Sequence, residues 1–443
     1  MIDAPLAFGG TQAASLWLSL GFAVLLVLGT LLRLWLAARQ IRHVAAHRNA
    51  VPGAFEGTVS LAAHQKAADY TVAKTRLGLI DIALSVAVLL GWTLMGGLDA
   101  LNGWLLSFLA PGLWQQVALV VAFALVSGVI ELPMSLYQTF VLEQRFGFNR
   151  GSLGLWLADL ARSTLLALLF GVPLVTLALW LMGAAGSGWW LWVWALWTGF
   201  NLLMLVIYPS FIAPLFNQFK PLADTALSER VGRLMARCGF QAQGLFVMDG
   251  SRRSGHANAY FTGLGRAKRV VFFDTLLARL SPAEVEAVLA HELGHFRHKH
   301  VLKRMVGIFA MSLAALAALG WLARQPWFYL GLGVTPNLTL QTTPGLGAPN
   351  DALALILFML AAPVVAFFVS PLMALLSRRD EFQADAFAAA QADPRDLTAA
   401  LLKLYEDNAA TLTPDPLYVD FYYSHPPAAQ RIQALGRLAV PGA

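Results

Sequence analysis

Residues 281–322 read SPAEVEAVLAHELGHFRHKHVLKRMVGIFAMSLAALAALGWL, so that a segment with four histidines precedes a long apolar stretch. Residues 304–323 contain a single charged residue. A transmembrane helix needs about 20 mostly apolar residues. The stretch therefore predicts a membrane span, with the histidine-bearing segment immediately before it at the membrane surface.

Six further stretches have the length and apolarity of a span. The seven predicted spans cover residues 15–35, 77–96, 117–138, 163–182, 189–210, 304–323 and 352–376. The composition agrees, because 58% of the 443 residues are hydrophobic and only 13% are charged, against roughly 25% charged residues in soluble domains. We expect a polytopic membrane protein and exclude an ordinary soluble globular one.

The lysine and arginine residues predict the direction of the spans, because they gather on the cytoplasmic side of a membrane. With seven spans, 30 of the 31 lysine and arginine residues fall on one side of the membrane. The two long polar segments, residues 211–303 and 377–443, lie on the same side. The N-terminus is then expected outside the cell and residues 211–303 in the cytoplasm. Because membrane orientation accounts for the net charge of +6, a nucleic-acid partner is not expected.

Two domains are expected, a membrane domain of five spans at 1–210 and a second domain at 211–443. Within the second domain, residues 211–303 have the composition of a small α+β unit. The pattern predicts a helix over 228–238, strands over 244–248 and 269–273, and a glycine-rich stretch over 250–265. The predicted fold class is thus an all-α polytopic membrane protein with a small cytoplasmic α+β domain, followed by a helical tail interrupted by prolines.

A helix with a metal-binding pattern follows this unit. Ser281 and Glu284 form a capping box that predicts its start. His291 and His295 are four residues apart, so they share one helix face and can bind one zinc ion. Glu292 stands beside the open position of such a metal, where a carboxylate can remove a proton from bound water.

A catalytic zinc site normally has a third protein ligand and a water molecule. Cys238 is the only cysteine, so a multi-cysteine site is excluded. Glu381 and Asp385 share a helix face just beyond the last span. One of them can bind the metal while the other holds a ligand histidine by its second ring nitrogen, and Asp380 competes for the ligand role on chemistry alone.

These motifs resemble those of the type I CAAX prenyl protease family, the a-factor-converting zinc endopeptidases of membranes. The segments that carry the likeness are HELGH at 291–295, EFQADAF at 381–387, NAYF at 258–261, KRVVFFDTLL at 268–277, SHPPAAQR at 424–431, HQKAADYT at 64–71 and QTFVLEQRFGFNR at 138–150. The resemblance implies seven helices around a water-filled chamber, with a gluzincin-type metalloprotease site and one Zn²⁺ ion per chain near its cytoplasmic side.

The resemblance also implies the metal chemistry of this chain. His291, His295 and Glu381 would be the zinc ligands, and Glu292 would be the general base. Asp385 would support a ligand histidine as part of the catalytic group.

A second group of residues would contact the substrate in the same resemblance. Asn258, Ala259 and Tyr260 resemble a substrate-binding edge, onto which an extended peptide adds as a strand. His425 resembles a catalytic residue that holds the oxyanion, and Arg431 resembles a residue that binds the substrate carboxylate.

The chamber implied by the resemblance would account for three acidic residues in or near the spans, Asp81, Glu131 and Asp159, because intramembrane acids usually face polar cavities or partners. Their alternative place is at a helix end, with the carboxylate reaching the interface. His298 and His300 are expected at the membrane interface and not as metal ligands.

The expected function is zinc-dependent hydrolysis of a peptide or protein substrate, including lipidated or membrane-associated ones, with CAAX tails as the substrate named for the family. One alternative is a quality-control protease of the heat-shock membrane metalloprotease type. The other is a non-catalytic membrane binding protein with a structural metal, which would not need Glu292. Richness in alanine, leucine, glycine and arginine favours a bacterial inner membrane.

Overall fold

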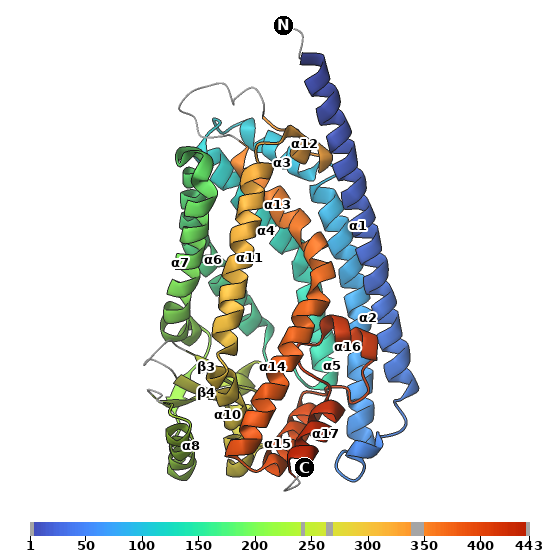
Figure 1. Cartoon of the computed structure of the whole chain (residues 1–443), viewed down its shortest axis with the longest axis vertical. Helices are drawn as coiled ribbons and strands as arrows, with labels where there is room; N and C mark the ends of the chain where they lie inside the picture. Colours follow the sequence, from blue (N-terminus) through green and yellow to red (C-terminus); the bar gives the residue numbers. More distant parts are fainter. Residues whose placement is uncertain (1–3, 241–243, 263–268, 338–349, 440–443) are drawn as a thin grey trace.

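The computed structural model describes residues 4–240, 244–262, 269–337 and 350–439. Seven described helices are long and apolar enough to cross a membrane, which confirms the predicted number of spans. They cover Gly10–Ala46, Leu61–Trp92, Leu113–Phe146, Leu153–Ala184, Gly186–Leu215, His300–Leu322 and Asp351–Gln391. Figure 1 shows the N-terminus, α3 and α12 at one end of this bundle, with the small sheet and the C-terminal helices at the other.

The helices of the first half are α1 (Ala4–Ala46), α2 (Leu61–Trp92), α3 (Gly97–Leu106), α4 (Leu113–Tyr137), α5 (Gln144–Phe146), α6 (Leu153–Ala184) and α7 (Trp189–Ile207). A π-helical turn, Gln138–Glu143, joins α4 to α5. Most spanning helices continue well past their apolar stretch at the end that carries the basic residues. Hydropathy detects only the part inside the bilayer, so the sequence predicts the spans but not these extensions.

The second half contains α8 (Thr225–Arg237), α9 (Asp274–Leu277), α10 (Pro282–Arg297), α11 (His300–Leu322), α12 (Pro326–Gly331), α13 (Asp351–Ala366), α14 (Ser370–Gln391), α15 (Pro394–Asp407), α16 (Pro416–Tyr422) and α17 (Ala428–Leu438). The Asp224 side chain accepts a hydrogen bond from Leu227 N at 2.9 Å, which caps α8 and starts it before the predicted residue 228. The helical tail is broken at Pro394 and Pro416, as predicted. Each proline begins the next helix, because the first helical turn has no partner for an N–H.

The sheet has the order β1-β2-β4-β3. Its strands are β1 (Phe219–Pro221), β2 (Leu245–Met248), β3 (Ala259–Thr262) and β4 (Arg269–Phe273). β2 and β4 were predicted, although β2 begins one residue later than expected. These two strands are parallel, whereas β1 with β2 and β3 with β4 pair antiparallel. β1 has three residues, too few to show an alternating pattern, and β3 lies within the predicted glycine-rich stretch 250–265. β3 is the outermost described strand on its side, and residues 263–265 of the glycine-rich stretch lie outside the described residues.

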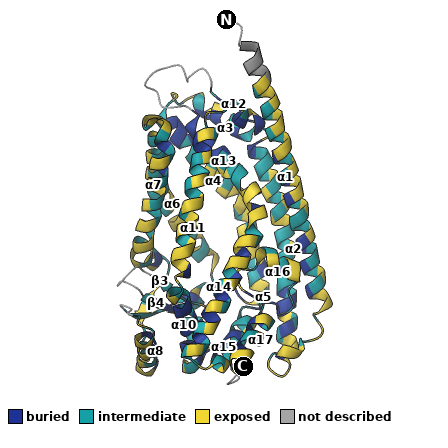
Figure 2. Ribbon diagram, viewed as in Figure 1, coloured by how far each residue is buried: buried dark blue, intermediate teal, exposed yellow. Residues whose placement is uncertain are grey.

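Several spanning helices bury side chains mainly near their ends. α2 buries residues from His64 to Tyr70 and then only Trp92, and α6 buries only Leu179 and Met182. A helix packed along its whole length would bury a residue in nearly every turn. Figure 2 shows the buried residues concentrated toward the two ends of the bundle. This arrangement agrees with the hollow bundle that the resemblance implies.

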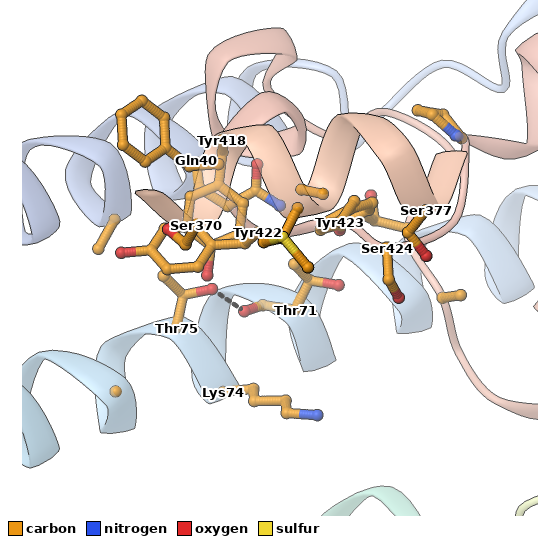
Figure 3. Close-up of a pocket in the computed structure, with 18 of the residues that line it drawn as sticks. Gln40, Thr71, Lys74, Thr75, Ser370, Ser377, Tyr418, Tyr422, Tyr423 and Ser424 are labelled. Atoms are coloured by element: carbon orange, nitrogen blue, oxygen red, sulfur yellow. Dashed lines mark hydrogen bonds between the residues drawn. The ribbon is translucent and has the colours of Figure 1, made fainter. Parts of the chain in front are cut away.

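A cavity of about 1430 Å³ occupies the lower part of this bundle, and we call it the chamber. Figure 3 shows Tyr418 and Tyr422 of α16 on one wall and Thr71 and Lys74 of α2 on another. Asp81 follows Lys74 by two helical turns and therefore lies on the same face of α2. That position agrees with an acid that faces a polar interior.

Candidate metal centre

α10 begins as the sequence predicts. Ser281 Oγ accepts a hydrogen bond from Glu284 N at 3.3 Å, and the Glu284 carboxylate accepts one from Ser281 N at 2.7 Å. The Glu284 carboxylate also lies 2.8 Å from Lys403 Nζ of α15. This capping box fixes the start of the helix, and it ties the metal-binding helix to α15.

α10 and α14 touch at Gly294. A Cβ on this residue would lie 2.8 Å from Ala384 Cα and 3.0 Å from the Ala384 carbonyl oxygen. Only a residue without a side chain allows two backbones to approach so closely. The contact brings the histidine face of α10 against Glu381 and Asp385 of α14.

Three candidate ligand atoms meet between these helices. The Nε2 atoms of His291 and His295 are 3.2 Å apart. The Glu381 carboxylate oxygens lie 3.5 Å from His291 Nε2 and 3.3 Å from His295 Nε2. Ligand atoms at about 2.0–2.1 Å from a tetrahedral zinc ion are separated by about 3.3–3.4 Å. Glu381 Oε2 is buried and has no hydrogen-bond partner among the described residues, so this donor set fits a zinc ion.

Asp385 holds the second ring nitrogen of the first histidine. Its Oδ1 lies 2.8 Å from His291 Nδ1. Arg431, from α17, donates to both Asp385 oxygens at 2.9 and 2.6 Å, and both residues are almost completely buried. The bidentate pair fixes the carboxylate, which in turn orients the imidazole. Most of the Arg431 guanidinium is therefore directed at Asp385, although Arg431 also lines the cavity beside the metal site.

His300 plays the corresponding part for the second histidine, which the sequence analysis did not foresee. Lys299 has a φ of 58°, and this left-handed residue turns the chain between α10 and α11. His300 Nδ1 then lies 3.0 Å from His295 Nδ1, while its Nε2 lies 3.1 Å from Gln383 Oε1. His300 is not among the candidate ligand atoms, as expected, and it begins the span His300–Leu322, but the turn also folds its ring back onto the metal-binding helix, a contact that the sequence does not predict.

Asp380 does not join the ligand atoms. Its carboxylate lies 3.4 Å from His300 Nε2 and 3.8 Å from Arg304 Nη2, on the chamber side of the site. Between the carboxylates that compete for the ligand role, the geometry favours Glu381.

A cavity of about 270 Å³, the metal cavity, collects most residues that the sequence singled out. They are Asn258, Ala259, His291, Glu292, Glu381, His425 and Arg431. Burial raises the pKa of the Glu292 carboxyl, as expected for a proton acceptor in a cavity of this kind. His425 lies between α16 and α17, with its Nε2 3.4 Å from Glu381 Oε1. Tyr405, Asn408 and Ala410 line both this cavity and the chamber, so the two spaces adjoin.

Tyr260 departs from the expected arrangement. Its hydroxyl lies 4.0 Å from Met248 Sδ, and the side chain lines a different pocket together with Tyr208 and Arg269. Successive side chains of a strand point to opposite faces. Ala259 therefore faces the metal cavity and Tyr260 faces away from it, so the Tyr260 side chain does not contribute to the proposed substrate-binding edge.

Residues 40–218 match the family described as CAAX prenyl protease N-terminal, five membrane helices, and residues 221–439 match the family described as peptidase family M48. The chain belongs to peptidase family M48. This M48 peptidase is 36% identical to the CAAX prenyl protease 1 homolog of Arabidopsis thaliana over 344 residues, which are 76% of this chain and 75% of the relative.

Two further relatives extend the comparison. The M48 peptidase is 34% identical to CAAX prenyl protease 1 of Saccharomyces cerevisiae over 325 residues, with 72% of each chain covered. The crystal structure of S. mikatae Ste24p matches it with a TM-score of 0.86 at 28% identity, covering 94% of this chain and 99% of that chain. The M48 peptidase is thus a multi-pass membrane metallopeptidase, an enzyme that hydrolyses peptide bonds in protein or peptide substrates. The family is zinc-dependent.

Proposed function

We propose that the chain is a zinc endopeptidase that cleaves CAAX-type carboxyl-terminal tails, with one zinc ion held by His291, His295 and Glu381 and with Glu292 as general base. The observation that carries the proposal is the convergence of three candidate ligand atoms, from buried His291 and Glu381 and half-buried His295, with the spacing that tetrahedral zinc requires. The match of residues 40–218 to the CAAX prenyl protease N-terminal family favours this substrate class over that of the heat-shock membrane metalloproteases.

Zinc bound at this site would lower the pKa of a water molecule and polarise the scissile carbonyl. Glu292 takes a proton from that water and later delivers it to the leaving amine. Asp385, held by Arg431, keeps the proton of His291 on Nδ1 and so leaves Nε2 free to bind the metal. His425 donates a hydrogen bond toward the substrate carbonyl oxygen as negative charge develops there.

The free edge of β3 would bind the substrate backbone. Phe273 N donates to Asn258 O, so strand alternation turns the N–H and C=O of Ala259 toward the free edge. The Ala259 N–H is meanwhile paired with Asn258 Oδ1 at 2.8 Å. An extended peptide would replace this side-chain contact with a strand-to-strand hydrogen bond, and the released Asn258 amide would bind the peptide from the side.

The metal cavity would open to the cytoplasm, with the N-terminus on the other side of the membrane. The distribution of 30 of 31 lysine and arginine residues supports this orientation. The assignment to a bacterial inner membrane rests on composition alone, and the relatives named above are eukaryotic.

The proposal is tested with purified full-length protein and a fluorogenic peptide that ends in a farnesylated CAAX sequence. Glu292→Gln should keep its zinc and its fold while losing about 10²–10⁴-fold in kcat. Glu286→Gln is the matched control, because this residue lies on the same helix and pairs with Arg230 and Arg237. If Glu292→Gln binds zinc and still cleaves at the wild-type rate, Glu292 is not the general base and the zinc ion has a structural role. If the wild type cleaves other peptides but not the CAAX peptide, the proposed substrate class is wrong and the assignment as a zinc endopeptidase stands.

A further inference from the structure

Residues 253–258 lead into β3, and we call them the lead-in segment. Side chains from other parts of the chain hold this segment in place. Thr275 Oγ1 donates to the His256 carbonyl oxygen at 2.9 Å. The Asn408 side chain accepts from Ala257 N at 3.1 Å and donates to Ala257 O at 3.4 Å. The position of β3 beside the metal cavity therefore depends on what holds this segment.

The membrane half supplies part of that hold through its backbone. In the turn after α5, the Phe148 carbonyl accepts from Gly255 N at 2.9 Å, and Arg150 N donates to the Arg253 carbonyl at 3.1 Å. Residues 149 and 254 form a β-bridge between these two bonds. The turn and the lead-in segment thus pair like two short antiparallel strands, although one belongs to the membrane half and the other to the peptidase half.

Asp159 adds a charged contact from α6. Its two oxygens accept hydrogen bonds from Arg253 Nε at 2.8 Å and Nη2 at 3.0 Å. Such a bidentate pair fixes the guanidinium in both distance and direction. The sequence singled out Asp159 as an acid near a span in need of a partner, and Arg253, at the start of the lead-in segment, is that partner.

Glu143, the last residue of the π-helical turn, makes a second charged contact. Tyr70 of α2 donates to Glu143 Oε1 at 2.6 Å. Glu143 Oε2 is buried without a hydrogen-bond partner in the described part of the chain, and it lies 3.6 Å from His256 Nε2. The His256 ring stacks on Phe148 with 4.4 Å between centroids, and its Nδ1 lies 3.1 Å from Asn408 Oδ1.

His256 itself lines neither the metal cavity nor the chamber. Its ring contacts Phe148, Glu143 and Asn408. Its backbone precedes Ala257 and Asn258, which do line the metal cavity. The side chain therefore attaches the lead-in segment to the membrane half and has no direct access to the metal ligands. π-helical turns such as the one that carries Glu143 are frequent at functional sites.

We propose that Glu143 and Asp159 are positioning residues for substrate capture, which act through His256 and Arg253 to place the β3 edge relative to the metal ligands. The inference rests on the proposed function of β3 as the peptide-binding edge. A bound peptide must reach β3 and the metal at once, so an edge that is not held in place binds the peptide more weakly. The membrane half is accordingly part of substrate recognition as well as an anchor.

The test measures binding apart from cleavage. Full-length, zinc-loaded protein in a Glu292→Gln background is titrated into a fluorescein-labelled, farnesylated CAAX peptide, and Kd is read by fluorescence anisotropy. Glu143→Ala and Asp159→Asn should each raise Kd roughly ten-fold, and KM likewise in the active background. Their zinc content should stay at the wild-type value and kcat within about two-fold of it.

Two further variants sharpen the result. Glu143→Gln should recover most of the affinity, because an amide can accept from Tyr70 and donate to the imidazole of His256. Asp69→Asn is the matched control, since Asp69 pairs with Arg48 inside the membrane half and makes no contact with the lead-in segment. Its Kd and KM should equal those of the wild type.

Asn258→Ala separates this inference from the proposed function. If Asn258→Ala weakens binding while Glu143→Ala and Asp159→Asn bind normally, the inference is wrong and the edge assignment stands. If Asn258→Ala also binds normally, the edge assignment itself fails. Equal losses of zinc, kcat and affinity in the Glu143 and Asp159 variants would reveal a general structural role and overturn the inference. Should Glu143→Ala not fold, Tyr70→Phe, which removes one hydrogen bond to Glu143, must still raise Kd for the inference to hold.

Discussion

Replacing Gly294 by alanine should separate the two helices that carry the metal ligands. The new Cβ would lie 2.8 Å from Ala384 Cα and 3.0 Å from the Ala384 carbonyl oxygen. Carbon atoms in contact prefer about 3.5–4.0 Å, so α14 must move away by roughly 0.7–1.2 Å. This shift exceeds the tolerance of about 0.2 Å for metal–ligand distances. It would change the distances between Glu381 on α14 and the two histidines on α10.

We expect Gly294→Ala to lower zinc affinity about 10- to 100-fold, in the range seen when the supports of a metal site are disturbed. The strain should also cost about 1–3 kcal/mol of folding stability. Zinc affinity is measured by competition with a chromogenic chelator, and stability by thermal unfolding in detergent. Because both close contacts are to backbone atoms, removing the Ala384 side chain in a Gly294→Ala/Ala384→Gly double variant should not restore zinc binding.

Gly232→Ala is the matched control. Gly232 lies inside α8 of the same domain, and a Cβ there would meet nothing within 4 Å. This substitution should leave zinc affinity unchanged and stabilise the helix by up to about 1 kcal/mol. If Gly294→Ala binds zinc within two-fold of the wild type, the close approach of α10 and α14 is not what assembles the site.

Three further outcomes are expected. Glu381→Ala should lose zinc and activity whereas Asp380→Ala should keep both, and the reverse result would transfer the ligand role to Asp380. His300→Ala should weaken zinc binding about ten-fold in chelator competition, because it removes the side chain that contacts the ligand histidine His295. If this variant binds zinc with wild-type affinity, His300 does not support the ligand. In a cysteine-free background, a cysteine at Gly186 should react with an impermeant thiol reagent added to intact cells and one at Glu229 should not. Labelling at Glu229 alone would invert the proposed orientation.

The parts of this fold that the sequence predicts are those that depend on local pattern. Long apolar stretches predict all seven spans, and Ser281 with Glu284 predicts the start of α10. The spacing of His291 and His295 is set within one helix, so their common face follows directly. The sequence narrows the third ligand only to a small group of neighbouring carboxylates that includes Glu381, because the distance of each from the histidines depends on how α14 crosses α10.

The features that the sequence does not predict depend on tertiary contacts. β3 has four residues, and its place at the sheet edge follows from pairing with β4. His300 becomes the partner of His295 only because Lys299 adopts a left-handed conformation, which nothing in the residue type favours. The inward or outward direction of Tyr260 follows from strand register, which a motif match does not contain.

The short passage from α10 into α11 links the metal centre to the lipid around it. α11 spans the membrane from its first residue, His300, and that same residue touches His295 of the metal cluster. A spanning helix changes its tilt when the hydrocarbon thickness of the bilayer changes. Thinner or thicker membranes would therefore reposition the ring that orients a candidate zinc ligand, and the turnover of this peptidase should vary with the acyl-chain length of the membrane that holds it.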